Sequence, residues 1–134
     1  MHWALQLLGV AIGGALGGVT RFWLSGAIAR RLGETFPWGT LVVNTTGAFA
    51  IGVLAALLTT RPGHVVLDTS LWAALVIGVL GSYTTVSAFS LQTLSLLRDR
   101  DYARAAGNVA ASLAGCLVAV VAGYLLALLI RGQA

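Results

Sequence analysis

The stretch 69–97 reads TSLWAALVIGVLGSYTTVSAFSLQTLSLL and carries no charged residue. It is longer than the about 20 apolar residues that an α-helix needs to cross a bilayer core. Its middle, from Gly78 to Ser90, is crowded with glycine, serine and threonine, which are poor helix formers. Two interpretations are open: a helix broken in mid-membrane, whose freed carbonyls would suit a small cation, or an intact helix whose hydroxyls bond back to their own carbonyls.

Three further stretches have the same character. They predict helices at about 3–30, 38–60 and 105–130, beside 69–97. Hydrophobic residues make up 58% of the chain and charged residues only 9%, against about 25% charged in soluble domains. The first stretch lacks a basic start and is read as a retained helix, not a signal peptide. The chain is therefore expected to be an all-α membrane protein, one transmembrane domain over 1–134, that crosses the cell (plasma or inner) membrane four times.

The charges and the cysteine exclude several functions. The net charge of +4 comes from arginines that flank the predicted spans, which favours contact with lipid headgroups over nucleic acid. The single cysteine, Cys116, allows neither an intrachain disulfide nor a Cys/His zinc site. No carboxylate lies inside a predicted span, so neither acid/base catalysis nor proton-coupled export is supported. We expect a protein that is not an enzyme.

The loop charges predict an orientation. An even number of spans places both termini on one side, and two arginines, Arg61 and Arg131, lie on that side. The opposite side carries Arg30, Arg31, Arg98, Arg100 and Arg104. The positive-inside rule predicts that the arginine-rich loops are cytoplasmic.

Small residues recur at four-residue spacing in two spans, a pattern that permits close helix packing in lipid. They are Gly9, Gly13 and Gly17 in the first span and Gly107, Ala111, Gly115, Ala119, Gly123 and Ala127 in the fourth. Both rows are predicted to be packing faces.

Polar residues inside the spans are the candidates for chemistry, because they need partners in hydrocarbon. Thr40 and Asn44 share a face of the second span, and Asn108, Ser112 and Cys116 form a row on the fourth. Each set either lines a path or supplies ordinary interhelical hydrogen bonds.

Arg21 is the one charge well inside a span. It either extends its side chain toward the interface, or binds an anion or the carbonyls at a helix end.

Three blocks, in order and on the expected spans, resemble the bacterial fluoride ion channel family called Fluc or CrcB. They are GGALGGVTRFW at 13–23, WGTLVVNTTGAFAIG at 38–52 and GVLGSYTTVSAFS at 78–90. The resemblance implies a passive, fluoride-selective channel: an antiparallel homodimer of dual topology with two fluoride paths and a structural sodium ion at its centre.

The resemblance also implies residue roles. Asn44 would hydrogen-bond fluoride, and Phe89 would offer its positive ring edge. The carbonyls of Gly81 and Thr84 would hold sodium. The remaining polar track would comprise Thr40, Thr85, Ser87 and Ser112, with Arg21 in a vestibule or structural position.

Two residues depart from the family pattern. Ser82 replaces a second glycine, and Val86 replaces the first of two paired phenylalanines, which removes one ring edge from each path. With the arginine asymmetry, Val86 motivates an alternative: an accessory subunit that pairs with a different, oppositely oriented chain. A small-cation exporter is the weaker alternative.

Overall fold

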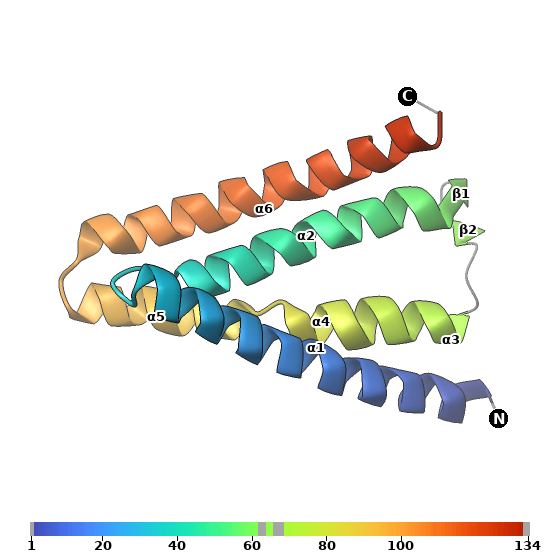
Figure 1. Ribbon diagram of the computed structural model, residues 1–134, viewed down its shortest axis with the longest axis horizontal. Coiled ribbons are helices and arrows are strands. Elements are labelled where there is room, and N and C mark those ends of the chain that lie inside the picture. The colour runs from blue at the N-terminus through green and yellow to red at the C-terminus, as the bar shows by residue number, and fades with distance from the viewer. Residues whose placement is uncertain (1, 62–63, 66–68, 133–134) are drawn as a thin grey trace.

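The computed structural model describes residues 2–61, 64–65 and 69–132, which form a bundle of long helices (Figure 1). Two short antiparallel strands, β1 (Thr59–Arg61) and β2 (His64–Val65), join the second and third spans. The helices are α1 (His2–Leu32), α2 (Trp38–Leu58), α3 (Thr69–Trp72), the π-helix η1 (Ala73–Leu80), α4 (Gly81–Tyr83), α5 (Val86–Arg98) and α6 (Tyr102–Ile130).

Four segments are long and apolar enough to span a membrane, which confirms the prediction of an all-α membrane protein. They are Trp3–Leu32, Trp38–Leu58, Ser70–Arg98 and Tyr102–Ile130. The second helix ends at Leu58, earlier than the predicted limit of 60, because the threonine pair that follows enters β1. Threonine favours strands, and this change was not foreseen.

The predicted glycine and alanine row of the fourth span is the surface that packs on α2. A Cβ atom at Gly123 would overlap the carbonyl of Phe49, and one at Gly52 would overlap the carbonyl of Val120. Ala127, one turn beyond Gly123, is only 1% exposed. Small side chains therefore allow the two backbones to touch, as van der Waals packing in lipid requires.

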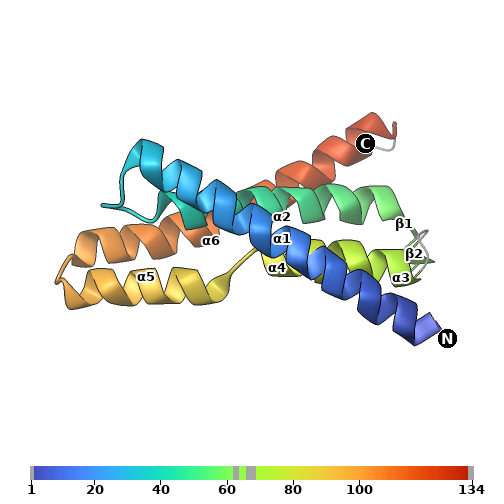
Figure 2. The same cartoon turned by 60° about the horizontal axis from the view of Figure 1, so that its bottom comes forward.

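The helix α1 crosses the N-terminal half of the third span, which consists of α3, η1 and α4 (Figure 2). A Cβ at Gly13 would overlap the carbonyl of Ala74, and one at Gly17 would overlap Ser82 Oγ and the carbonyl of Val79. The predicted packing role of these glycines is thus confirmed, and they bring α1 against η1 and α4.

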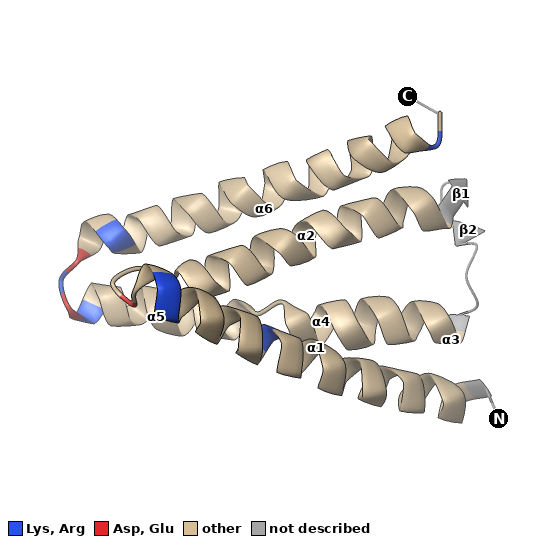
Figure 3. Cartoon of the chain, viewed as in Figure 1, with Lys and Arg blue, Asp and Glu red and all other residues tan. Residues whose placement is uncertain are grey.

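Both chain ends lie at one end of the bundle, as an even number of spans requires (Figure 1). Most charged positions gather at the opposite end, around the α1–α2 and α5–α6 connections (Figure 3). There Asp101 caps α6, because its Oδ1 accepts from the backbone N–H of Arg104 at 3.1 Å. At the end with the termini, Arg131 donates to the carbonyl of Ala56, one of the carbonyls in the last turn of α2 that have no helical donor.

Candidate functional site

The third span is interrupted between α4 and α5. Thr84 has φ −79° and ψ 158°, and Thr85 has φ −152° and ψ 122°, so both are extended. The broken-helix interpretation is therefore correct. Back-bonding also occurs before the break, where Ser82 Oγ donates to the carbonyl of Gly78 at 2.7 Å and Thr84 Oγ1 to that of Leu80 at 3.0 Å.

The amide of Asn44 closes on the break from α2. Asn44 Nδ2 donates to the carbonyl oxygen of Thr85 at 2.8 Å, and the backbone N–H of Thr85 donates to Asn44 Oδ1, also at 2.8 Å. One side chain thus satisfies both backbone groups of Thr85, which is 8% exposed. The amide keeps a second N–H hydrogen for another acceptor.

The break releases the carbonyls of residues 81–84, the last four before the N-cap residue of α5, from their helical donors. In a continuous helix, the N–H of Thr85 would bond the carbonyl of Gly81, and the N–H of Ala88 would bond that of Thr84. Here the first donates to Asn44 Oδ1 and the second to Thr85 Oγ1, at 3.2 Å. The carbonyls of Gly81 and Thr84, both selected from the sequence, are therefore released from their usual helical donors.

A second contact fixes the α4 side of the break. Thr46 Oγ1 donates its one hydrogen to the carbonyl of Val42 at 2.7 Å, so Tyr83 Oη is the donor in the 2.8 Å bond between the two hydroxyls. Beside this bond, a Cβ at Gly47 would overlap the methyl group of Thr84. A single turn of α2 thus holds both ends of the break.

Two hollows meet at Thr85. The first, called the vestibule here, has a volume of about 710 Å³ and lies between the α1–α2 loop and α5. The second, called the central groove, has a volume of about 450 Å³ and lies between α2, the break and α6. The central groove is lined by Asn44, Gly47, Ala48, Ile51, Val76, Leu80, Gly81, Thr84, Thr85, Val86 and Cys116.

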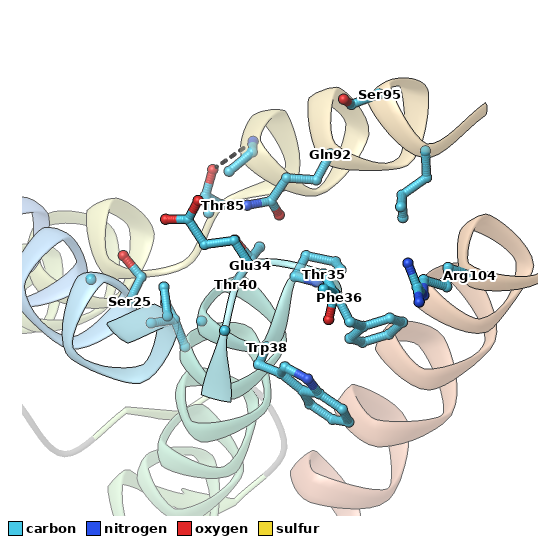
Figure 4. Close-up of a pocket in the computed structure, with 18 of the residues that line it drawn as sticks. Ser25, Glu34, Thr35, Phe36, Trp38, Thr40, Thr85, Gln92, Ser95 and Arg104 are labelled. Carbon is cyan, nitrogen blue, oxygen red and sulfur yellow. Dashed lines mark hydrogen bonds between the residues drawn. The ribbon is translucent and has the colours of Figure 1, made fainter. Parts of the chain in front are cut away.

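One face of α5 and the residue before this helix form a polar wall of the vestibule. Gln92 and Ser95, three residues apart on α5, line it together with the N-cap residue Thr85 (Figure 4). The carbonyl oxygen Oε1 of Gln92 is buried and has no hydrogen-bond partner within the described part of the chain. The sequence reasoning selected neither Gln92 nor Ser95, although their helical register with Thr85 was a usable signal.

Charged residues of both signs line the vestibule. Arg104 Nη1 lies 3.1 Å from Asp101 Oδ2, and Glu34 extends from the α1–α2 loop toward the side where Thr85 and Gln92 lie (Figure 4). Arg21, from α1, also lines the vestibule and is half-buried. Its guanidinium is the cation that the sequence placed deepest in a span.

The structure brings together some of the predicted site residues and not others. Thr40, Thr85 and Arg21 line the vestibule, and Asn44, Gly81, Thr84 and Thr85 line the central groove. Phe89, Ser87 and Ser112 are not among the residues that line either hollow. Ser87 instead bonds Thr85 through their hydroxyls at 3.1 Å.

The fold and the site define a small helical membrane protein with an uncharged cluster of hydrogen-bonding groups between two hollows. Residues 8–124 match the family described as CrcB-like protein, Camphor Resistance (CrcB), and the chain belongs to this family.

Similar proteins carry informative names. The chain is 53% identical over 121 residues to "Fluoride-specific ion channel FluC 2" of Bradyrhizobium diazoefficiens. The aligned residues cover 90% of this chain and 88% of that protein. The chain is 56% identical over 119 residues to the protein of the same name from Rhodopseudomonas palustris, covering 88% and 89%. A third relative, "Fluoride-specific ion channel FluC" of Opitutus terrae, is 55% identical over 118 residues, covering 88% and 89%. The suspected family is confirmed, and these relatives are named as channels, not as enzymes.

Proposed function

We propose that this chain is a fluoride-specific ion channel of the cell membrane that lets fluoride leave passively. The observation that carries this function is its similarity, at more than half identity over most of both chains, to proteins named fluoride-specific ion channels. The site is compatible with that chemistry, because Asn44 keeps a second N–H as a donor and the groups that line the central groove with it carry no fixed charge. Such donors can replace the water around a small anion without trapping it.

The path we propose runs from the vestibule to Asn44. Arg21 attracts the anion into the vestibule, and Thr40 and Thr85 lead from there to the remaining N–H of Asn44. Beyond it, Ser87, Ser112 and the ring edge of Phe89 continue the path. These last residues line neither hollow of the single chain, so their contribution requires a second copy.

The second copy is an antiparallel one, as the family resemblance implies. Thr46, Ser87 and Ser90 are exposed on the single chain although they lie within the spans, and polar groups that face lipid are costly. Val86, beside the central groove, is 76% exposed. A partner chain over this face would cover these groups and complete two equivalent paths.

We further propose a structural sodium ion held by the carbonyls of Gly81 and Thr84. The donors fit, because carbonyl oxygens suit a hard cation and the amides that would otherwise bond them are directed elsewhere. Each copy supplies two such oxygens, so two copies would supply four. When bound, the ion would offset the repulsion between carbonyl dipoles of the two copies.

Fluoride efflux from liposomes that contain only the purified chain tests the function. A fluoride electrode should record rapid efflux with this protein and none with empty liposomes. The sodium ion is tested separately by replacing all sodium with a large organic cation during purification. The dimer should then be less stable than in sodium.

The accessory-subunit alternative rests on Val86 and on the asymmetry of the loop arginines. It predicts silent liposomes with the chain alone and efflux once an oppositely oriented partner is added. The small-cation exporter has no support from the relatives, which are named fluoride-specific ion channels.

A further inference from the structure

Asn108 is the most buried polar side chain in the described part of the protein. It lies on α6 and is 2% exposed. Burying an amide costs free energy unless the amide is hydrogen-bonded, and leucine, of similar volume, would fill the same space without this cost. The partners of Asn108 are therefore informative.

Asn108 begins a directed chain of hydrogen bonds that crosses from α6 to α5. Its Nδ2 donates to Thr93 Oγ1 at 2.9 Å, and Thr93 Oγ1 donates to the carbonyl oxygen of Phe89 at 2.8 Å. A hydroxyl has one hydrogen, so while Thr93 donates it to the carbonyl of Phe89 it can only accept from Asn108, and the direction of the chain is fixed. The chain of bonds ends on the backbone of the residue whose ring we place in the fluoride path.

We propose that Asn108 is a positioning residue that acts through Thr93 to fix Phe89. This inference rests on the proposed function, in particular on the role of Phe89. Because α5 follows the extended residues of the break, covalent continuity with α4 does not set its direction. Its orientation depends on its packing, chiefly against α6.

The bond from Thr93 to the carbonyl of Phe89 also acts on the helix itself. A threonine hydroxyl that bonds the carbonyl four residues earlier bends its helix slightly. Here the same hydroxyl is held by Asn108, so one hydroxyl links the backbone of α5 at Phe89 to α6.

Four variants and a matched control test the proposal in liposomes. Thr93→Val and Asn108→Leu each remove the link with little change of volume, their double variant removes both partners, and Thr93→Ser retains the hydroxyl. Thr20→Val is the control, because Thr20 makes the same bond back to the carbonyl of Leu16, at 2.7 Å, on the exposed side of α1. Fluoride efflux per folded protein is measured over a range of fluoride concentrations, and folding is followed by elution in detergent.

We expect each single variant to elute like the wild type and to lose about three- to tenfold in efflux. This factor corresponds to the free energy of one interhelical hydrogen bond in a membrane. The double variant should be no slower than the slower single one, Thr93→Ser should be near wild type, and Thr20→Val should be unchanged. The fluoride concentration for half-maximal efflux should also rise, which lost stability alone would not cause.

Wild-type efflux in both single variants would overturn the proposal, as would losses that multiply in the double variant, since two independent contacts behave in that way. If Asn108→Leu fails to fold, Thr93→Val decides by itself. If the wild-type protein itself gives no fluoride efflux, the proposed function is refuted. This result differs from failure of the Asn108 proposal, in which the wild type conducts and the variants conduct equally well.

Discussion

Replacing Asn44 by leucine tests whether the break in the third span depends on α2. The change removes the acceptor of the Thr85 N–H and one donor to the Thr85 carbonyl, both now at 2.8 Å. As the N-cap residue of α5, Thr85 keeps the helical bond between its carbonyl and the N–H of Phe89. One unsatisfied buried N–H would cost roughly 1–3 kcal/mol by measurements in soluble proteins, and the lost bond to the carbonyl adds to this. Interhelical bonds in membranes average only about 0.6 kcal/mol, with a maximum near 1.7. We therefore expect Asn44→Leu to lower the free energy of unfolding by about 2–3 kcal/mol.

Asn44→Asp separates the structural role from the electrostatic one. An aspartate can still accept from the N–H of Thr85, but its second oxygen then faces the carbonyl oxygen that Asn44 Nδ2 now serves. Stability should fall by at least as much as in the leucine variant, because a half-buried carboxylate that faces a carbonyl oxygen costs more than an unpaired neutral group. Fluoride efflux should be abolished as well, because a carboxylate repels the anion.

Equilibrium unfolding in mixed detergent, followed by tryptophan fluorescence, measures the stabilities, and a fluoride electrode measures efflux from liposomes. Thr20→Val is the control for loss of a side-chain hydrogen bond far from the break. Surface substitutions usually change stability by no more than about 0.5 kcal/mol. A change as small as this in Asn44→Leu would refute the idea that Asn44 holds the break. Unchanged efflux in Asn44→Asp would remove Asn44 from the path.

Three further outcomes follow from the structure. Val86→Phe should keep or raise fluoride efflux, since the side chain is 76% exposed beside the central groove; a folded but silent variant would mean that the pore is shaped around valine. Gly123→Leu should cost about 3 kcal/mol or more through overlap with the carbonyl of Phe49, seen as lost folded yield, whereas Val121→Leu, at a position 55% exposed, should not. Arg21→Gln should slow efflux a few-fold at low ionic strength and less in 0.5 M salt, because salt screens the attraction at the vestibule; an equal loss at both salt concentrations would argue for a structural role.

The parts of the fold that repeat along the chain could be predicted from the sequence. Long uncharged stretches specify spans, and a row of small residues such as Gly123 and Ala127 specifies a packing face, because both properties belong to one helix by itself. The hairpin of β1 and β2 was missed, since a pair of threonines at the end of an apolar run gives a weak signal.

The break could be located from the sequence but not explained by it. Glycine, serine and threonine weaken the helix around residues 78–90, which left an intact helix equally plausible. The decision comes from another element, because Asn44 accepts the N–H of Thr85 that would have continued the helix from α4 and also donates to the Thr85 carbonyl. A contact between residues 41 positions apart cannot be read from local propensity.

The site was predicted in part for a similar reason. Residues at the break itself, Thr85 above all, lie where the sequence placed them. Gln92 and Ser95 were missed because their face of α5 becomes a wall only when the α1–α2 loop lies across from it. Phe89 and Ser112 line no hollow of the single chain, so neither their sequence pattern nor this structure assigns their role without a second copy.

The two hydrogen bonds between Asn44 and Thr85 would let one short turn of α2 serve both the break and the proposed fluoride path. Asn44 uses one N–H and its oxygen to hold the backbone, and these bonds orient the amide plane rigidly. Its second N–H is therefore aimed by the same contacts that keep the helix broken. A donor held in this way need not reorganise when an anion arrives, so it can stabilise the ion without the entropy cost that a mobile side chain would incur. We therefore expect a donor fixed in this way to favour the entry of a strongly hydrated ion such as fluoride into the proposed path.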